Sequence, residues 1–203
     1  MDKKICIVDY NAGNVKSLFH SIKKICNHEV IVSNELAVIK NADYIVLPGV
    51  GSYSYVSNYL SVRKLDITLK SAMIESHKPI LGICLGMQIL FDSSTEFGYS
   101  KGLSILSGTV DELDNNSNFP LPNIGWRYVE MSNSINTPFE SGWFYFAHSY
   151  CVKNIDPKNI IATSKYLNNF PSIVNHNNFY GVQFHPEKSS KNGLDFLNTF
   201  FKL

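Results

Sequence analysis

Short apolar runs alternate with helical periodicity in the first half of the chain, and this alternation constrains the fold more than any other feature. Four runs end at polar or turn-forming residues and predict buried strands at 5–8, 30–32, 44–47 and 79–83. Apolar residues recur at helical spacing over 15–25, 65–75 and from Met87 to Phe91, which predicts helices there. Strands that alternate with helices form a mostly parallel central sheet with helices on both faces. We therefore expect an α/β fold.

The second half of the chain has a different pattern. The Asn-rich stretch 114–118 predicts a loop, and shorter strand candidates follow at 142–146, 159–163 and 179–184. Asn-rich turns separate these candidates, which favours antiparallel additions to the same sheet. A last helix is expected at about 192–201. Without an internal repeat or a clear linker, residues 1–203 are predicted to form a single domain.

Composition and the N-terminal residues limit the classes of function. The formal net charge is +1 and 17% of the residues are charged, so no overall field directs the protein to nucleic acid or to a membrane surface. No apolar stretch approaches the ~20 residues of a membrane-spanning helix. The first apolar run ends at Asp9, too early for a signal peptide. We expect a cytoplasmic protein.

The four cysteines favour free thiols over a metal site. None of them is paired in a C-x-x-C motif, which argues against a zinc site and against a redox pair. We expect reduced cysteines in a reducing compartment and no bound metal. The cysteines are Cys6, Cys26, Cys84 and Cys151.

Cys84 stands in the sequence Gly82-Ile83-Cys84-Leu85-Gly86, between a predicted strand and a helical pattern. This context is that of a nucleophile elbow, a tight strand-to-helix turn that exposes a reactive side chain. The glycines are needed because a side chain at either position would crowd the turn. The helix that follows favours the thiolate, which is a strong nucleophile. The alternative is a buried core cysteine. Cys6, Cys26 and Cys151 have no flanking glycines, and we interpret them as core or incidental residues.

His185 is the candidate base for this nucleophile. It follows an apolar run, and Glu187 lies two residues later, past Pro186. A carboxylate there can accept a hydrogen bond from one imidazole nitrogen and leave the other to face the thiol. Taken alone, His185 is as readily interpreted as a histidine in a surface turn. Four other histidines have no comparable partners, and we interpret them as surface or hydrogen-bonded core residues: His20, His28, His77 and His176.

The third element is Pro48-Gly49-Val50-Gly51, directly after the third predicted strand. Glycines there allow backbone N–H groups to approach a developing oxyanion. The alternative is an ordinary strand-ending turn.

These three elements together resemble the class I, or triad, glutamine amidotransferases. Further motifs are similar to one group within that class, the glutaminase subunits of imidazole glycerol phosphate synthase, and they occur in order along almost the whole chain. The motifs are DYNAGN at 9–14, PGVG at 48–51, GICLGMQ at 82–88, GW at 125–126, YFAHSY at 145–150 and QFHPEKS at 183–189. The resemblance implies a flavodoxin-like class I amidotransferase fold.

The resemblance also implies roles for individual residues. Cys84 would be acylated by the side chain of glutamine, His185 would transfer protons, and Glu187 would orient His185. Backbone N–H groups would hold the oxyanion, and side chains would line the glutamine pocket, with no cofactor. These residues are Gly49, Val50, Gly51 and Leu85 for the oxyanion and Gln88, Ser149 and Tyr150 for the pocket.

The resemblance further implies a heterodimer with a (βα)₈-barrel cyclase subunit. Ammonia would pass to that partner, which forms imidazole glycerol phosphate and AICAR nucleotide in histidine biosynthesis. Neither a nucleic acid nor a membrane is expected as a partner. The residues that match partner-facing segments are Trp126, Arg127, Tyr145 and Lys188.

Two residues depart from the pattern of this group. Asn123 replaces the usual histidine, and Arg127 replaces the usual asparagine. An altered partner surface keeps open a second function, a paralogous glutaminase that supplies ammonia for amidino-sugar synthesis in surface-polysaccharide biosynthesis. The intact Cys84, His185 and Glu187 argue against a non-catalytic scaffold. The GMQ run after Cys84 argues against a stand-alone cysteine hydrolase.

Overall fold

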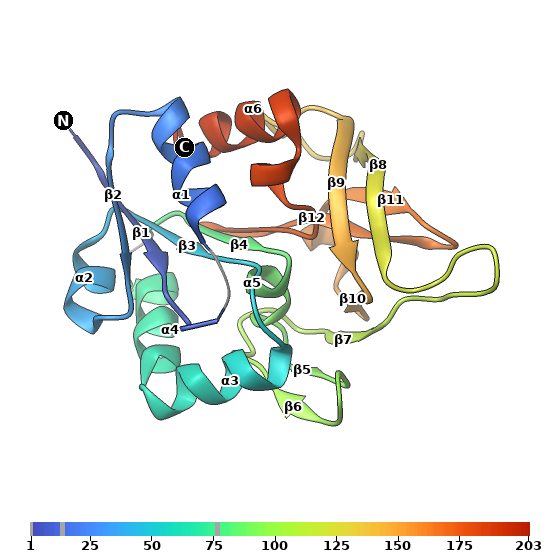
Figure 1. Ribbon diagram of the computed structural model, residues 1–203, viewed down its shortest axis with the longest axis horizontal. Helices are drawn as coiled ribbons and strands as arrows, with labels where there is room; N and C mark the ends of the chain where they lie inside the picture. The colour runs from blue at the N-terminus through green and yellow to red at the C-terminus, as the bar shows by residue number, and fades with distance from the viewer. Residues whose placement is uncertain (1, 13–14, 76–77) are drawn as a thin grey trace.

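A nine-stranded mixed sheet forms the centre of the computed structural model, which describes residues 2–12, 15–75 and 78–203 (Figure 1). Its strand order is β2-β1-β3-β4-β13-β12-β11-β8-β9. The last two residues of the 9–14 motif, and His77, lie outside the described residues. The strands are β1 (Lys4–Val8), β2 (Glu29–Ser33), β3 (Tyr44–Leu47), β4 (Ile80–Ile83), β8 (Asn123–Met131), β9 (Gly142–His148), β11 (Ile160–Lys165), β12 (Asn169–His176) and β13 (Phe179–Val182).

The first five strands in this order are parallel and follow the 2-1-3-4-5 arrangement of flavodoxin-like folds. The four predicted strands of the first half are confirmed as β1 to β4. The prediction of antiparallel additions is confirmed for the candidates at 142–146 and 159–163, which are β9 and β11. Strands β8 and β12, which were not predicted, are antiparallel as well. The prediction is wrong in part for 179–184, because β13 pairs in parallel with β4. The tight turn between β12 and β13 makes these two strands antiparallel to each other. The turn does not constrain the other edge of β13, which pairs in parallel with β4 and completes the parallel part of the sheet.

Helices cover both faces of the parallel part. Two of them, α1 (Lys16–Ile25) and α6 (Ser190–Phe200), contact each other on one face, and α2 (Leu36–Asn41), α3 (Tyr53–Val62) and α4 (Leu65–Glu75) lie on the other (Figure 1). Strand β1 alternates its side chains between the two cores, with Ile5 and Ile7 on the α1–α6 side and Cys6 and Val8 on the other. The predicted helices at 15–25, 65–75 and 192–201 are confirmed. Helices α2 and α3 were not predicted.

The helix predicted from Met87 to Phe91 is wrong in its length and position. Helix α5 (Leu85–Gln88) is a single turn that begins directly after Cys84. The following residues are apolar because they are buried in the core, and three of their carbonyl groups accept hydrogen bonds from residues 103–106. The apolar run therefore reflects a buried turn rather than one face of a long helix.

A second, four-stranded sheet packs beside the first, with the order β10-β7-β5-β6. The sequence predicted a single sheet, but β10 turns away from β9 after Ser149 and pairs with β7. The predicted loop at 114–118 is confirmed between the two sheets. The strands are β5 (Ser93–Ser94), β6 (Ser100–Lys101), β7 (Thr109–Glu112) and β10 (Tyr150–Lys153), and two short 3₁₀ helices are η1 (Pro157–Asn159) and η2 (Pro186–Lys188).

Within the described residues, no helix combines the length and the apolar character needed to cross a membrane. The same residues include no cluster of three or more histidine, cysteine or acidic side chains with the spacing of a metal site. All four cysteines are free thiols.

Candidate active site

Three neighbouring parallel strands, β3, β4 and β13, end at the same edge of the sheet. Gly49 lies just past β3, Cys84 directly after β4, and His185 shortly after β13. In open α/β sheets this edge is where ligands bind. The topology therefore gathers the three motifs that the sequence placed at separate strand ends.

Cys84 has the geometry of a nucleophile elbow. It links β4 to α5 with φ 48° and ψ −108°, a backbone conformation that residues other than glycine rarely adopt. A Cβ at Gly82 would lie 2.5 Å from the carbonyl oxygen of Gly86, and a Cβ at Gly86 would lie 2.0 Å from that of Leu47. Both glycines are thus required for the close crossing of β4, α5 and β3, as the sequence predicted.

His185 lies beside Cys84 and is paired with Glu187. The Nδ1 atom of His185 is 2.9 Å from Oε1 of Glu187, and both side chains are largely buried. The Ser189 hydroxyl donates to the carbonyl oxygen of His185 and accepts from the N–H of Tyr145, which ties this segment to β9. A Cβ at Gly49 would lie 2.8 Å from Cβ of Cys84 and 3.2 Å from Cε1 of His185, so these two side chains flank one glycine.

The charges around His185 favour its protonated form. Burial by itself lowers the pKa of His185, but the Cys84 sulfur and the Glu187 carboxylate together outweigh burial and raise this pKa to about 10. An imidazolium beside a sulfur stabilises the thiolate and can also donate a proton to a leaving group. The arrangement can therefore carry out nucleophilic acyl transfer.

A cleft of about 280 Å³ opens at Cys84. Of the seven residues expected at the oxyanion and in the glutamine pocket, all except Val50 line it; Val50 packs instead against the core on the α3 side. The sequence did not predict five further lining residues. Ala147 and His148 lie within the YFAHSY motif, but Glu96, Phe97 and Pro122 lie in segments outside the motifs given above. The expected lining residues are Gly49, Gly51, Leu85, Gln88, Ser149 and Tyr150.

His148 is a buried neutral histidine in the wall of this cleft. Burial, together with the nearby positive charges of His185 and Arg127, lowers its pKa to about 4, although a hydrogen bond to the Tyr150 carbonyl opposes this. Nδ1 of His148 lies 2.8 Å from the Tyr150 carbonyl oxygen. Because a carbonyl can only accept a hydrogen bond, Nδ1 carries the proton of the neutral ring. Its Nε2 atom then accepts from Nδ2 of Asn123 at 3.0 Å. Asn123, one of the two departures, is therefore buried against the cleft wall.

The four residues predicted to face a partner do not share one surface. Trp126 and Tyr145 form an edge-to-face pair with ring centroids 6.2 Å apart, and the Lys188 ammonium lies 5.9 Å from the Tyr145 ring. Arg127 follows Trp126 on the strand and points to the other face, with its guanidinium 5.1 Å from the ring of Tyr166. The structure brings the first three together and separates Arg127 from them.

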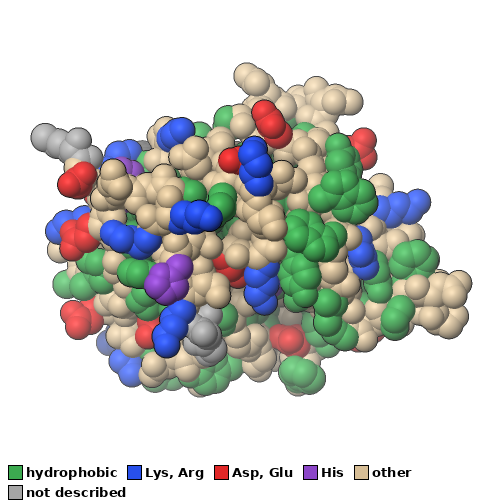
Figure 2. Space-filling model, turned by 45° about the horizontal axis from the view of Figure 1, so that its top comes forward, with side chains coloured by type: hydrophobic (Ala, Val, Ile, Leu, Met, Phe, Trp, Pro, Cys, Tyr) green, Lys and Arg blue, Asp and Glu red, His purple; other side chains and the backbone are tan. Residues whose placement is uncertain are grey.

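Exposed apolar side chains extend the surface around Trp126. Ile124, Tyr128 and Trp143 are exposed on the same face of the β8–β9 hairpin, and Tyr128 packs edge-to-face on Trp143. Figure 2 shows hydrophobic side chains gathered over this part of the molecule, with basic side chains beside them. We call Ile124, Trp126, Tyr128, Trp143 and Tyr145 the hairpin face. Exposed apolar clusters of this kind mark interaction surfaces.

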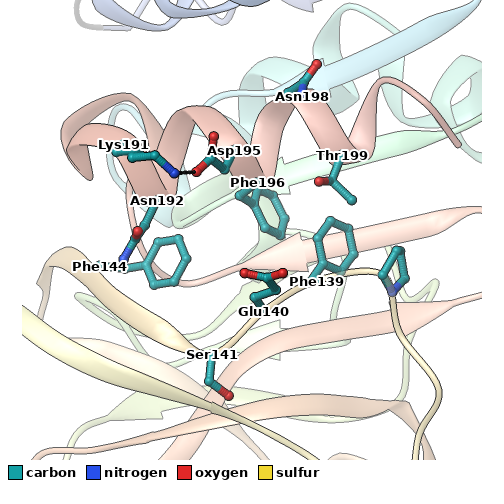
Figure 3. Close-up of a pocket in the computed structure, with 11 residues that line it drawn as sticks. Phe139, Glu140, Ser141, Phe144, Lys191, Asn192, Asp195, Phe196, Asn198 and Thr199 are labelled. Atoms are coloured by element: carbon teal, nitrogen blue, oxygen red, sulfur yellow. Dashed lines mark hydrogen bonds and ion pairs between the residues drawn. The ribbon is translucent and has the colours of Figure 1, made fainter.

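A larger pocket, of about 360 Å³, lies away from Cys84, between α6 and residues 138–141 (Figure 3). Phe139, Phe144 and Phe196 line its interior, and an ion pair between Lys191 and Asp195 spans 2.7 Å on α6. None of the described residues that line it is a cysteine or a histidine. This pocket therefore lacks a thiol nucleophile and a histidine base, and the Cys–His pair lies at the smaller cleft.

The other cysteines differ from Cys84 in their surroundings. Burial raises the pKa of Cys6 to about 11 and that of Cys151 to about 12, which keeps both as neutral thiols. Cys26 is at the C-terminus of α1, where its thiol donates to the carbonyl of Ile22. These positions agree with the interpretation of all three as core or incidental residues.

Comparisons with known proteins agree with this geometry. Residues 6–203 match the family described as glutamine amidotransferase class-I. The chain is 42% identical over 198 residues to imidazole glycerol phosphate synthase subunit HisH of Listeria innocua, covering 97% of this chain and 94% of that relative. It is 41% identical over 202 residues to subunit HisH 2 of Methanococcus maripaludis, covering 98% of each.

Solved structures confirm the fold independently. A crystal structure of a glutamine amidotransferase superposes with a TM-score of 0.76 at 14% identity, covering 98% of this chain and 99% of the other. The structure of PurLQS from Thermotoga maritima superposes with a TM-score of 0.71 at 20% identity, covering 100% of this chain and 97% of the other. At such identities the likeness establishes the fold alone, whereas the sequence matches extend to the family. This chain belongs to the class I glutamine amidotransferases and, within them, to the family of HisH subunits of imidazole glycerol phosphate synthase.

Proposed function

We propose that the chain hydrolyses glutamine to glutamate and ammonia, with Cys84 as nucleophile, His185 as proton carrier and Glu187 as the group that orients His185. The observation that carries this proposal is the juxtaposition of Cys84 in its elbow with the His185–Glu187 pair at one cleft. A thiolate next to an imidazolium is suited to attack on an amide carbonyl.

The chemistry balances with these three side chains and water. The Cys84 thiolate adds to the side-chain carbonyl of glutamine, and the resulting oxyanion is stabilised by backbone N–H groups near Gly49–Gly51 and at Leu85. His185 donates its proton to the nitrogen, the C–N bond breaks, and ammonia leaves a thioester on Cys84. His185, now neutral, accepts a proton from water, which attacks the thioester and releases glutamate and the thiolate.

The polar groups of the cleft suit an amino acid. Glu96 supplies a carboxylate for the α-ammonium group, and the same carboxylate accepts a 2.6 Å hydrogen bond from the N–H of Tyr53, which holds it in place. Gln88 donates from Nε2 to the Tyr150 carbonyl and to Oε1 of Gln183, so its own oxygen is the group that it can offer to a ligand. Ser149 and Tyr150 complete the wall.

We further propose that the ammonia passes to the cyclase subunit of imidazole glycerol phosphate synthase in a heterodimer, which forms imidazole glycerol phosphate and AICAR nucleotide. The relatives named above, similar over almost their whole length, support this assignment. The hairpin face and Lys188 offer a docking surface close to the site, since Lys188 directly follows Glu187 and its ammonium lies over Tyr145.

The alternative acceptor, an amidino-sugar precursor, rested on Asn123 and Arg127. Neither side chain belongs to the hairpin face, because Asn123 is buried against His148 and Arg127 packs over Tyr166. The two departures therefore leave the proposed docking surface unchanged, which favours the histidine pathway over the sugar pathway.

The experiment is to measure glutamate release by the purified chain alone and after mixing with the histidine-pathway cyclase and its substrate. We expect little hydrolysis by the chain alone and a strong increase on mixing, with imidazole glycerol phosphate as product. Activation by a cyclase-like subunit of the sugar pathway, and none by the histidine cyclase, would establish the alternative. High hydrolysis that does not change on mixing would contradict the proposed coupling.

A further inference from the structure

A buried amide contacts the sulfur of Cys84. The side chain of Gln183 is fully buried directly after β13, and its Nε2 atom lies 3.4 Å from Sγ of Cys84. The backbone fixes its place in the sheet, because the N–H of Gln183 donates to the carbonyl of Ser172 at 3.0 Å. This amide has no part in the triad.

The orientation of the amide follows from a chain of hydrogen bonds that starts at a backbone carbonyl. The Tyr150 carbonyl oxygen accepts from Gln88 at 2.9 Å, and because a carbonyl can only accept, the atom of Gln88 that faces it must be Nε2. The same Nε2 atom is 3.0 Å from the Gln183 amide, so the facing atom there must be the acceptor Oε1. The NH₂ group of Gln183 is thereby left facing Cys84.

We propose that Gln183 stabilises and positions the catalytic thiolate by donating an amide N–H to Sγ of Cys84, with Gln88 locking the amide in the donating orientation. In this arrangement the sulfur has a charged partner on one side, His185, and a neutral donor on the other. A hydrogen bond to an ionised group favours the ionised form, and more strongly in a buried site than in water. The consequence for glutamine hydrolysis rests on the proposed function, but the contact with the sulfur does not.

Several titratable groups lie at the same cleft as the sulfur. His185 follows β13 and carries the positive charge, with Glu187 behind it. Across the cleft are His148, neutral on β9, and Glu96, whose carboxylate is held by the N–H of Tyr53. A substitution of Gln183 by an apolar residue leaves all four in place, so a change in thiolate formation in that variant reports the amide itself.

The test is the pH dependence of Cys84 alkylation by iodoacetamide, followed by mass spectrometry of the peptide that contains Cys84. The variants are Gln183→Met, which keeps the length of the side chain and removes the donor, and Gln183→Glu, which places a carboxylate beside the sulfur. Ser172→Ala is the matched control, because Ser172 is buried on the neighbouring strand next to Gln183 and its hydroxyl has no hydrogen-bond partner among the described residues. Partly exposed Cys26 serves as an internal reference in each sample.

We expect the midpoint of the alkylation profile to move upward by about 1 to 2 pH units in Gln183→Met, the effect of losing one hydrogen bond to a charged group. Gln183→Glu should move it at least as far, and Ser172→Ala should leave it in place. A folded Gln183→Met with the midpoint of Ser172→Ala would overturn the proposal. If Gln183→Met does not fold, Gln183→Leu decides in the same way, since it also removes the donor without adding a charge.

Glutamine hydrolysis is measured separately with Cys84→Ala. If Cys84→Ala still hydrolyses glutamine, the proposed function is wrong, while the alkylation midpoint still decides the role of Gln183. If hydrolysis depends on Cys84 but the midpoint does not respond to Gln183, the glutaminase stands and the role of the amide is refuted.

Discussion

Gly49 is the glycine that lies against both reacting side chains, Cys84 and His185. A Cβ there would lie 2.8 Å from both Cβ of Cys84 and the carbonyl oxygen of Ile83, and 3.2 Å from Cε1 of His185. We predict that Gly49→Ala lowers glutamine turnover by about 100-fold, because displacement of reacting groups by ~1 Å has effects of that size. Overpacking should also cost about 1–3 kcal/mol of unfolding free energy.

The measurements for Gly49→Ala are glutamate release in the complex with the partner and urea unfolding. Gly142→Ala is the control, since its Cβ meets only the end of the Asn192 side chain at short range, away from Cys84. Full activity in a folded Gly49→Ala would show that the strand end after β3 is not part of the site.

His148 should make stability depend on pH. Its pKa in the folded protein is lowered to about 4, chiefly by burial, whereas an unfolded histidine has a pKa of ~6.5. Between these two pKa values the unfolded state binds more protons than the folded state. The free energy of unfolding therefore increases as the pH rises through this range and decreases as the pH falls. The loss from this one group between pH 7 and pH 5 is about 2 kcal/mol.

Urea unfolding of the unaltered chain and of His148→Gln at both pH values tests this expectation. The difference between pH 7 and pH 5 should shrink by about 2 kcal/mol in the variant. An equal pH dependence in both proteins would mean that His148 does not stay neutral in the folded state.

Sequence reasoning located the reactive side chains because their signals are local. Cys84 has a glycine on each side two residues away, and His185 stands at a strand end with Glu187 within reach. It missed Glu96 and the contact of Gln183 with the sulfur, since both depend on where distant segments meet. A buried glutamine just past the end of a strand carries no local signal that tells which atom its amide will contact.

At the scale of elements, the β8–β9 hairpin separates two residues that are adjacent in sequence. Trp126 lies on the hairpin face and Arg127 on the opposite face, over Tyr166. We predict that Trp126→Ala weakens partner binding by about 30-fold or more, as expected for a central aromatic anchor. Arg127→Asn should leave binding unchanged and cost at most about 1 kcal/mol of stability, the size of an exposed cation–π contact.

Titration calorimetry with the partner subunit compares these two variants directly. Arg127→Asn and Trp126→Ala serve as controls for each other, because the two substitutions are at adjacent positions of the same strand. If Arg127→Asn weakened binding as much as Trp126→Ala, the docking surface would have to include the Tyr166 face.

The elements that sequence patterns missed share one property: their environment, not their own periodicity, determines them. Helix α5 ends after one turn because the apolar residues that follow are buried by residues 103–106. Strand β13 joins the parallel sheet through β4, a partner almost a hundred positions away in the chain. Helix α3 is rich in tyrosine, serine and valine, which are mediocre helix formers, so neither propensity nor a clear apolar stripe indicated it.

At the scale of the whole molecule, the alternation of strands and helices sufficed to predict the fold class. The same topology explains why the site lies where it does, since β3, β4 and β13 are neighbours whose carboxyl ends meet at one edge. The second sheet was not predictable in this way. Its strands are short and polar, and they are held by pairing between segments far apart in the chain. That sheet nevertheless provides Tyr150, whose carbonyl fixes the orientation of the amides behind Cys84.

The most direct test of the central claim uses Cys84→Ala in the reconstituted complex with the cyclase subunit, supplied with either glutamine or an ammonium salt. The account predicts that glutamine-dependent formation of imidazole glycerol phosphate is abolished, because attack on the amide requires the thiolate. Ammonium-dependent formation should remain at the level of the unaltered complex, because added ammonia bypasses that step. Retained glutamine hydrolysis in Cys84→Ala would contradict the account.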